Sequence, residues 1–213
     1  MDDLHRQLLP AFVGAVVGGP VLAAAAYAYW RSFKRLSLGP RLSFAIVLAA
    51  LVSFYSVNVY AWFVEPNELV VRKYDVERAD WRGPPLKIAA LGDLHINGPH
   101  VRPARMQSVV ARVNALKPDM VVLLGDYVAG HQPWAQRSPE DKAAIERGIA
   151  ALTALKGVKI AVIGNHDVWT DAFEIAYLLR RAGFNVLWNA NARIERADGA
   201  SVAMIGLADA VTG

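Results

Sequence analysis

The 213-residue sequence contains no cysteine, which excludes disulfide bonds and thiolate metal sites. Any bound metal must therefore be held by oxygen and nitrogen ligands. Long runs of basic residues are also missing, and the formal net charge is only +4. Because nucleic-acid binding depends on clustered positive charge, we expect no nucleic-acid partner.

Charge is also missing from two long stretches near the start of the chain, residues 7–30 and 42–64. Each is longer than the roughly 20 residues that a helix needs to cross the hydrocarbon core of a bilayer. We therefore predict transmembrane helices over about residues 8–30 and 42–64. Residues 1–65 then form a membrane anchor, and the lipid bilayer is a partner of the protein. A buried core helix is the alternative interpretation of the first stretch.

The connection between these stretches, residues 31–41, has four basic residues and no acidic one. Short loops of this kind stay on the cytoplasmic side of a membrane. This rule places the domain after the second helix outside the cytoplasm, in an integral protein of an inner or plasma membrane. Neither stretch contains Asp, Glu, Lys, Arg or His, which disfavours a transporter or a channel.

Residues 66–213 follow a different pattern, in which short apolar runs alternate with amphipathic stretches. Three runs are almost continuously apolar, at residues 87–92, 120–125 and 158–163. Strands of this kind, separated by helical patterns, predict an α/β domain with a parallel sheet covered on both faces. We also predict an edge strand over residues 69–76 and a C-terminal hairpin that turns at Asp198-Gly199.

Each of the three runs stops at a glycine and then presents side chains that can bind metals. The residues concerned are Asp93 and His95, then Asp126, then Asn165 with its neighbour His166. Ligands of open α/β sheets bind outside the carboxyl ends of the strands, so we expect one site assembled from three strand ends. On an extended backbone Asp93 and His95 point the same way, whereas His166 points away from Asn165, toward a phosphate oxygen or a leaving alkoxide. Such ligands suit Mn²⁺, Fe or Zn²⁺.

In this order and spacing, Asp93-Leu94-His95, Gly125-Asp126 and Gly164-Asn165-His166-Asp167 resemble the signature of the calcineurin-like metallophosphoesterases. The resemblance covers roughly residues 86–207 and implies part of a four-layer αββα sandwich, in which two sheets are flanked by helices. It implies that two divalent metal ions are held by four ligands, Asp93, His95, Asp126 and Asn165. Asp126 would bridge the two ions and, with His166, would be a catalytic residue. The membrane-anchored members of the family look most similar.

The activity implied by the resemblance is that of a hydrolase acting on phosphoric ester bonds. In such enzymes a hydroxide that bridges two metal ions attacks the phosphorus of a phosphate ester or a pyrophosphate. Because the chain is predicted to be anchored, we expect its partner to be a phosphorylated small molecule or a lipid, lipid-linked pyrophosphates included.

The sequence departs from the family pattern after residue 167. The family continues with a further single His and then a Gly-His-x-His, whereas no histidine follows His166 here. We therefore expect residues 66–213 to be only the N-terminal portion of such a domain. If these 213 residues were the whole protein, we would expect weak metal binding, little turnover and an apolar sheet face left without its cover. The alternative function is a catalytically incomplete membrane-anchored fragment or interaction module that lacks the C-terminal His ligands.

Several residues near the predicted site have two interpretations. His100 and His131 lie in the loops after the first and second apolar runs, and can be solvated or can touch substrate. The nearby Trp134 and Trp169 can be packing residues or can contact a lipid or an aromatic group. Asp167 can cap the helix that follows it.

Overall fold

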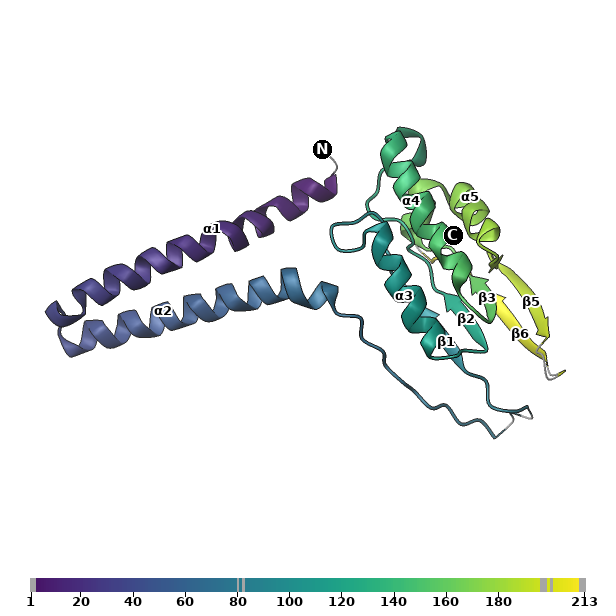
Figure 1. The fold of residues 1–213 in the computed structure, drawn as a ribbon, viewed down its shortest axis with the longest axis horizontal. Coiled ribbons are helices and arrows are strands. Elements are labelled where there is room, and N and C mark those ends of the chain that lie inside the picture. Colours follow the sequence, from purple (N-terminus) through teal and green to yellow (C-terminus); the bar gives the residue numbers. More distant parts are fainter. Residues whose placement is uncertain (1–2, 80, 82, 196–198, 200, 211–213) are drawn as a thin grey trace. The chain divides into compact units, whose positions relative to one another are not determined.

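The computed structural model describes residues 3–79, 81, 83–195, 199 and 201–210 (Figure 1). The chain separates into two compact units, residues 1–72 and 73–213. This division places both long apolar stretches in the first unit and all three strand-end motifs in the second.

The first unit is a hairpin of two helices, α1 (Asp3–Ser32) and α2 (Leu38–Val59), joined by the 3-10 helix η1 (Phe33–Arg35). α2 continues through a π-helical turn, η2 (Tyr60–Val64), and a 3-10 turn, η3 (Glu65–Asn67). Figure 1 shows α1 and α2 close together near the turn that joins them and farther apart toward the N-terminal end of α1.

The two helices pack together where α1 has its smallest residues. A Cβ atom on Gly18 would lie 3.0 Å from the ring of Tyr55 in α2, and one on Gly19 would lie 2.9 Å from the Tyr55 hydroxyl oxygen. Nearer the turn, the rings of Tyr29 and Phe44 stack with their centroids 4.8 Å apart. The two glycines therefore make room for a tyrosine of the neighbouring helix, and α1 remains helical through them.

In the described part of the chain, one helical segment, Leu38–Asn67, is long and apolar enough to cross a membrane. It spans 30 residues and contains the predicted span 42–64, and no residue of α2 is buried within the protein. The other predicted span, 8–30, is helical as part of α1. A two-helix anchor stays a prediction.

The second unit contains a parallel sheet of four strands, whose order along the sheet, β1-β2-β3-β4, follows the chain. The strands are β1 (Ile88–Leu91), β2 (Met120–Leu123), β3 (Val158–Ala161) and β4 (Asn185–Val186). The first three correspond to the three apolar runs. This part of the fold is the α/β arrangement that the sequence predicts.

Three helices connect the strands: α3 (Pro103–Ala115), α4 (Pro139–Ala151) and α5 (Asn165–Arg181). α3 and α4 both begin at a proline, whose fixed φ suits the first helical position. α5 is interrupted at Asp171, where the backbone is extended. The Asp171 carboxylate accepts hydrogen bonds from the N–H groups of Phe173 and Glu174, both at 3.1 Å, and so caps the longer second part of the helix.

A two-stranded antiparallel hairpin follows the parallel sheet. Its strands are β5 (Ala190–Glu195) and β6 (Ser201–Gly206), as the C-terminal pattern predicts. Asp198 of the predicted turn lies outside the described residues. The predicted edge strand over residues 69–76 is wrong, because residues 68–78 have no regular secondary structure. Within the described residues, this segment pairs with no strand, and β1 remains the edge strand of the sheet.

The two faces of the parallel sheet are covered differently. On one face, Val121 and Ala161 share a core with the buried sides of α3, α4 and α5, whereas Met120 and Ile160, on the other, pack with the hairpin. All three helices lie on the same face because the strands are added in one direction and the crossovers of parallel strands are right-handed. Ile88, the register partner of Met120, is 48% exposed, so the hairpin covers the second face only in part.

Candidate metal centre

The loops that follow β1, β2 and β3 meet at the carboxyl edge of the parallel sheet. Backbone hydrogen bonds join the first two loops: the N–H of Asp93 donates to the carbonyl of Gly125 at 3.2 Å, and that of His95 donates to the carbonyl of Asp126 at 3.0 Å. The parallel pairing of β1 and β2 thus continues beyond the strands. It brings Asp93 and His95 alongside Asp126, as the strand-end argument predicts.

The backbone of these residues is left-handed rather than extended. The φ angles are 53° at Asp93, 40° at His95 and 57° at Asp126. The prediction that Asp93 and His95 point the same way on an extended chain therefore rests on the wrong backbone conformation. A left-handed residue with a side chain costs roughly 1–2 kcal/mol. Three of them at one edge mark a segment whose shape is imposed by its surroundings, as is common at functional sites.

The loops after β2 and β3 touch each other at two glycines. Gly125 has φ 98°, and a Cβ atom there would lie 2.7 Å from the backbone nitrogen of Gly164. A Cβ atom on Gly164 would collide with the carboxylate of Asp126 and would lie 2.6 Å from its backbone nitrogen. A side chain at either position would push the loops apart. Both glycines are therefore needed for Asp126 to reach the start of α5.

Asp167 connects these two loops by hydrogen bonds from beneath the protein surface. Its side chain is fully buried, with 0% exposure. The carboxylate accepts three backbone hydrogen bonds, from the N–H groups of Gly164 at 3.0 Å, Asp126 at 2.9 Å and Tyr127 at 2.8 Å. Burial raises the pKa of the Asp167 carboxyl to about 6, and the three donors oppose that rise.

The role of Asp167 is larger than the helix capping that the sequence suggests. It does accept the N–H of Gly164, the residue just before α5. The donors at Asp126 and Tyr127, however, are 41 and 40 residues away along the chain. No local pattern indicates that the same carboxylate also serves another loop.

Tyr127 completes the attachment of the second loop to β3. Its ring is fully buried, and its hydroxyl donates a hydrogen bond to the carbonyl of Val162 at 2.7 Å. Burial, together with the nearby Asp167, raises the pKa of Tyr127 well above its ordinary value. The hydroxyl therefore stays protonated and keeps donating.

Three potential metal ligands converge at this edge: His95, Asp126 and His166. Their ligand atoms all lie within 4.8 Å of one another. The backbone N–H of His166 donates to Oδ1 of Asp126 at 3.0 Å, and Nδ1 of its ring lies 3.2 Å from the carbonyl of Gly130. Because a carbonyl can only accept, this contact places the proton of a neutral His166 on Nδ1 and leaves Nε2 available.

Asp93 and Asn165 lie at the margins of this cluster. Oδ1 of Asp93 is 3.7 Å from Nε2 of His95, and the Asp93 side chain is 80% exposed. Asn165 is the first residue of α5, directly before His166, and is partly buried. Because Asn165 and His166 lie in a helical turn, the alternation of an extended chain does not apply to them. The ring of His166 accordingly meets that of His95 edge to face, 4.7 Å between centroids.

The neighbouring rim residues fall into two groups. His131 and Trp169 contact His166, with ring centroids 4.8 and 5.0 Å from that of His166. Trp134 lies in the 3-10 helix η4 (Trp134–Gln136) and packs against the core, which agrees with the packing interpretation. His100 is partly buried, and this burial, with a nearby arginine, lowers its pKa.

The donor set fits divalent cations that prefer oxygen and nitrogen. Two imidazoles and a carboxylate converge at the cluster, and the carboxylate of Asp93 is close enough to swing toward it. Softer thiolate donors do not occur in the chain. Manganese, iron and zinc are the metals that such a mixture suits.

The comparisons with known proteins agree with this chemistry. The family model of the calcineurin-like phosphoesterases matches residues 86–208, more than half of the chain. The chain therefore belongs to the calcineurin-like phosphoesterase family.

Curated relatives match at low identity. A "Transmembrane protein with metallophosphoesterase domain" from Danio rerio is 27% identical over 71% of this chain and 32% of the relative. An "Uncharacterized metallophosphoesterase" from Aquifex aeolicus is 31% identical over 66% of this chain and 48% of the relative. A UDP-2,3-diacylglucosamine pyrophosphatase from Chlamydia muridarum is 29% identical over 62% of this chain and 38% of the relative. The chain thus spans about a third to a half of the length of these relatives.

Proposed function

We propose that the chain is part of a metal-dependent phosphoesterase that hydrolyses a phosphate ester or a pyrophosphate. The observation that supports this best is the convergence of His95, Asp126 and His166 at the carboxyl edge of the sheet. Asp126, His95, Asp93 and Asn165 would hold two divalent cations at this edge, and His166 would contact the phosphate.

Divalent cations bound here would polarise a phosphoryl oxygen and lower the pKa of a water molecule, which supplies a nucleophile near neutral pH. The residues of the chain position the reaction. The N–H of His166 holds Oδ1 of Asp126 and so restricts rotation of that carboxylate. The contact of His166 Nδ1 with the Gly130 carbonyl leaves Nε2 available. When protonated, Nε2 can donate to a phosphoryl oxygen or to the leaving oxygen.

We further propose that the substrate lies at or near a membrane, as a phosphorylated lipid or a lipid-linked pyrophosphate. One relative is named for the diacylated substrate UDP-2,3-diacylglucosamine, and another is named a transmembrane protein. The apolar segment Leu38–Asn67 supports anchoring of this chain. A second span over residues 8–30, a cytoplasmic loop at residues 31–41 and a catalytic domain outside the cytoplasm complete this proposal.

Hydrolysis and metal binding test the proposal separately. The full chain in detergent is titrated with Mn²⁺ by calorimetry and assayed with bis(p-nitrophenyl) phosphate and p-nitrophenyl phosphate. We expect Asp126→Ala to abolish Mn²⁺ binding and hydrolysis, and His166→Ala to reduce hydrolysis by about 10²-fold or more. Glu146→Ala, at an exposed carboxylate of α4, is the matched control and should change neither. Equal hydrolysis by the wild type and Asp126→Ala would contradict the proposal.

A second candidate is a catalytically incomplete interaction module. It is favoured by the position of Asp93, whose carboxylate is 80% exposed and lies outside the three ligands that converge. Saturable Mn²⁺ binding that depends on Asp126, without hydrolysis of either ester, would support this candidate.

A further inference from the structure

The solvent-exposed side of α5 has an unusual composition. The described residues of this helix that are exposed are three aromatic residues and two arginines: Trp169, Phe173, Tyr177, Arg180 and Arg181. We call this set the α5 outer face. Phe173 is 79% exposed and Tyr177 is 52% exposed. Trp169, at 39%, lies where the face meets the metal centre, because its ring contacts that of His166.

The other two helices of the same unit expose ordinary side chains. The exposed residues of α4 include Glu140, Glu146 and Arg147, and those of α3 include Gln107 and Arg112. A helix that faces water normally presents such polar and charged groups opposite its buried stripe. α5 differs in having aromatic rings where polar residues are expected, although its inner side is buried like those of α3 and α4.

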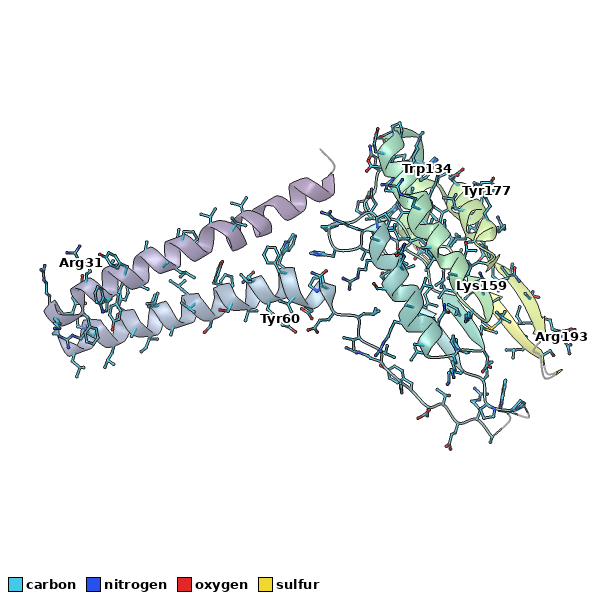
Figure 2. The ribbon with its side chains drawn as sticks, in the orientation of Figure 1. Arg31, Tyr60, Trp134, Lys159, Tyr177 and Arg193 are labelled. Atoms are coloured by element: carbon cyan, nitrogen blue, oxygen red, sulfur yellow. The ribbon has the colours of Figure 1, made fainter. Side chains whose placement is uncertain are left out.

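Phe173, Tyr177 and Arg181 lie along one side of the part of α5 that follows its interruption at Asp171. Phe173 and Tyr177 are one turn apart, and Arg181 follows one turn later, with its guanidinium carbon 5.7 Å from the centre of the Tyr177 ring. The ring of Phe173 lies 5.6 Å from that of Trp188, which extends the aromatic surface toward β5. Figure 2 shows Tyr177 projecting from the outer side of α5.

Aromatic rings combined with arginines match the boundary between lipid headgroups and acyl chains. Tryptophan and tyrosine prefer this depth because their rings are apolar and their N–H or O–H groups are polar. Arginines add attraction to anionic headgroups, whereas the acids of α5 are buried (Asp167) or only partly exposed (Asp171 and Glu174).

The chain also supplies a reason for a bilayer to be nearby. The segment Leu38–Asn67 is long and apolar enough to cross a membrane. Only the connector of residues 68–87 separates it from β1, and about 20 residues span at most ~70 Å even when fully extended. If Leu38–Asn67 enters a membrane, the connector therefore keeps the second unit within about 70 Å of that membrane.

We propose that the α5 outer face lies in the headgroup region of the membrane and holds the metal centre beside it. This proposal rests on the proposed function in one respect: it assumes that the substrate comes from the membrane. Trp169 then links the two sites, since it touches His166 on one side and continues the face on the other.

Single labels can test this docking in the full chain, because the chain has no cysteine of its own. Phe173→Cys and Tyr177→Cys are each labelled with an NBD fluorophore, as is Glu146→Cys on α4. The proteins are reconstituted in vesicles of phosphatidylcholine and phosphatidylglycerol that contain headgroup spin-labelled lipid. We expect the labels at positions 173 and 177 to be quenched at least about twofold more than the label at position 146. The double substitution Arg180→Gln and Arg181→Gln should reduce this difference in quenching. The reduction should be larger in vesicles that contain phosphatidylglycerol than in vesicles of phosphatidylcholine alone.

Equal quenching at all three positions, or none at position 177, would overturn the proposal. Protection of position 177 that grows with protein density and is insensitive to spin-labelled lipid would also overturn it, because a second copy of the chain would then cover the face. The same measurement in an Asp126→Ala background separates docking from catalysis. Quenching that persists there supports docking even if no hydrolysis is ever detected.

Discussion

The metal centre has a rigid side and a mobile side. The rigid side consists of the loops after β2 and β3, and the mobile side is the Asp93 carboxylate of the loop after β1. Asp126 and His166 are fixed by the contact of Gly125 with Gly164 and by the hydrogen bonds to Asp167. The loop after β1 is also held by its backbone, but the carboxylate of Asp93 is 80% exposed. One side of the centre is therefore set before a cation arrives, and the other side can move onto it. Substitutions on the rigid side should therefore lower the free energy of unfolding more than substitutions at Asp93.

The largest loss of stability is expected for Asp167→Ala. The substitution leaves three buried N–H groups without their acceptor, and each such group costs about 1–3 kcal/mol. We expect the free energy of unfolding at pH 4 to fall by about 4 kcal/mol, measured by urea titration of the full chain in detergent with tryptophan fluorescence. Glu146→Ala is the control and should stay within about 0.5 kcal/mol of the wild type. A loss below about 1 kcal/mol for Asp167→Ala would show that the loops hold without this carboxylate.

The contribution of Asp167 should also depend on pH. Its pKa in the fold is about 6, above the ordinary value of 3.8, so the folded protein favours the protonated carboxyl. The stability that this preference provides is complete below pH 3.8 and is lost as the pH rises through about 6. The difference in unfolding free energy between the wild type and Asp167→Ala should therefore shrink by up to about 3 kcal/mol from pH 4 to pH 7.5. The measurement is made in EDTA, and a difference that grows with pH would be the opposite result.

Gly164→Ala should have the next largest effect. The added methyl group meets the carboxylate and the backbone nitrogen of Asp126, so the two loops must separate. We expect a loss of about 2 kcal/mol in unfolding free energy together with weaker Mn²⁺ binding, seen by urea titration and calorimetry. Gly39→Ala is a suitable control, because a Cβ atom there has nothing within 4 Å. Unchanged Mn²⁺ affinity in Gly164→Ala would mean that the position of Asp126 is not fixed by this contact.

Asp93→Ala should have the smallest effect on stability. An exposed carboxylate 3.7 Å from an imidazole contributes little to the folded state, so the unfolding free energy should change by less than about 0.5 kcal/mol. Affinity for Mn²⁺ should nevertheless fall by about tenfold or more, measured by calorimetry. A large loss of stability here would remove the contrast between the two sides of the centre.

The sequence predicts the strands of the domain better than the loop conformations at the carboxyl edge of its sheet. The three continuous apolar runs become β1, β2 and β3, and the carboxyl ends of parallel strands necessarily share one edge. Those two facts are enough to bring His95, Asp126 and His166 together. The apolar stretch 42–64 likewise lies within the segment that is long enough to cross a membrane.

The edge itself depends on contacts between distant parts of the chain. The left-handed backbone of Asp93 and His95 follows from hydrogen bonds to the loop after β2, which local spacing does not encode. The same is true of Asp167, whose partners are supplied by another loop. The strand predicted over residues 69–76 is wrong for a related reason: a strand exists only where a neighbour pairs with it, and composition alone cannot supply the neighbour.

The order of the strands has a consequence for synthesis of the protein. Each of β2, β3 and β4 pairs with the strand that precedes it in the chain, so the sheet can grow at one side as residues leave the ribosome. The loop carrying Asp126 is made well before its buried acceptor at Asp167 exists, 41 residues later. Until then its N–H groups must be satisfied by water. A nascent chain paused between β2 and β3 would therefore contain Asp93, His95 and Asp126 but not Asp167, which fixes the loop of Asp126. We would expect cation binding to begin only after the loop that follows β3 has formed.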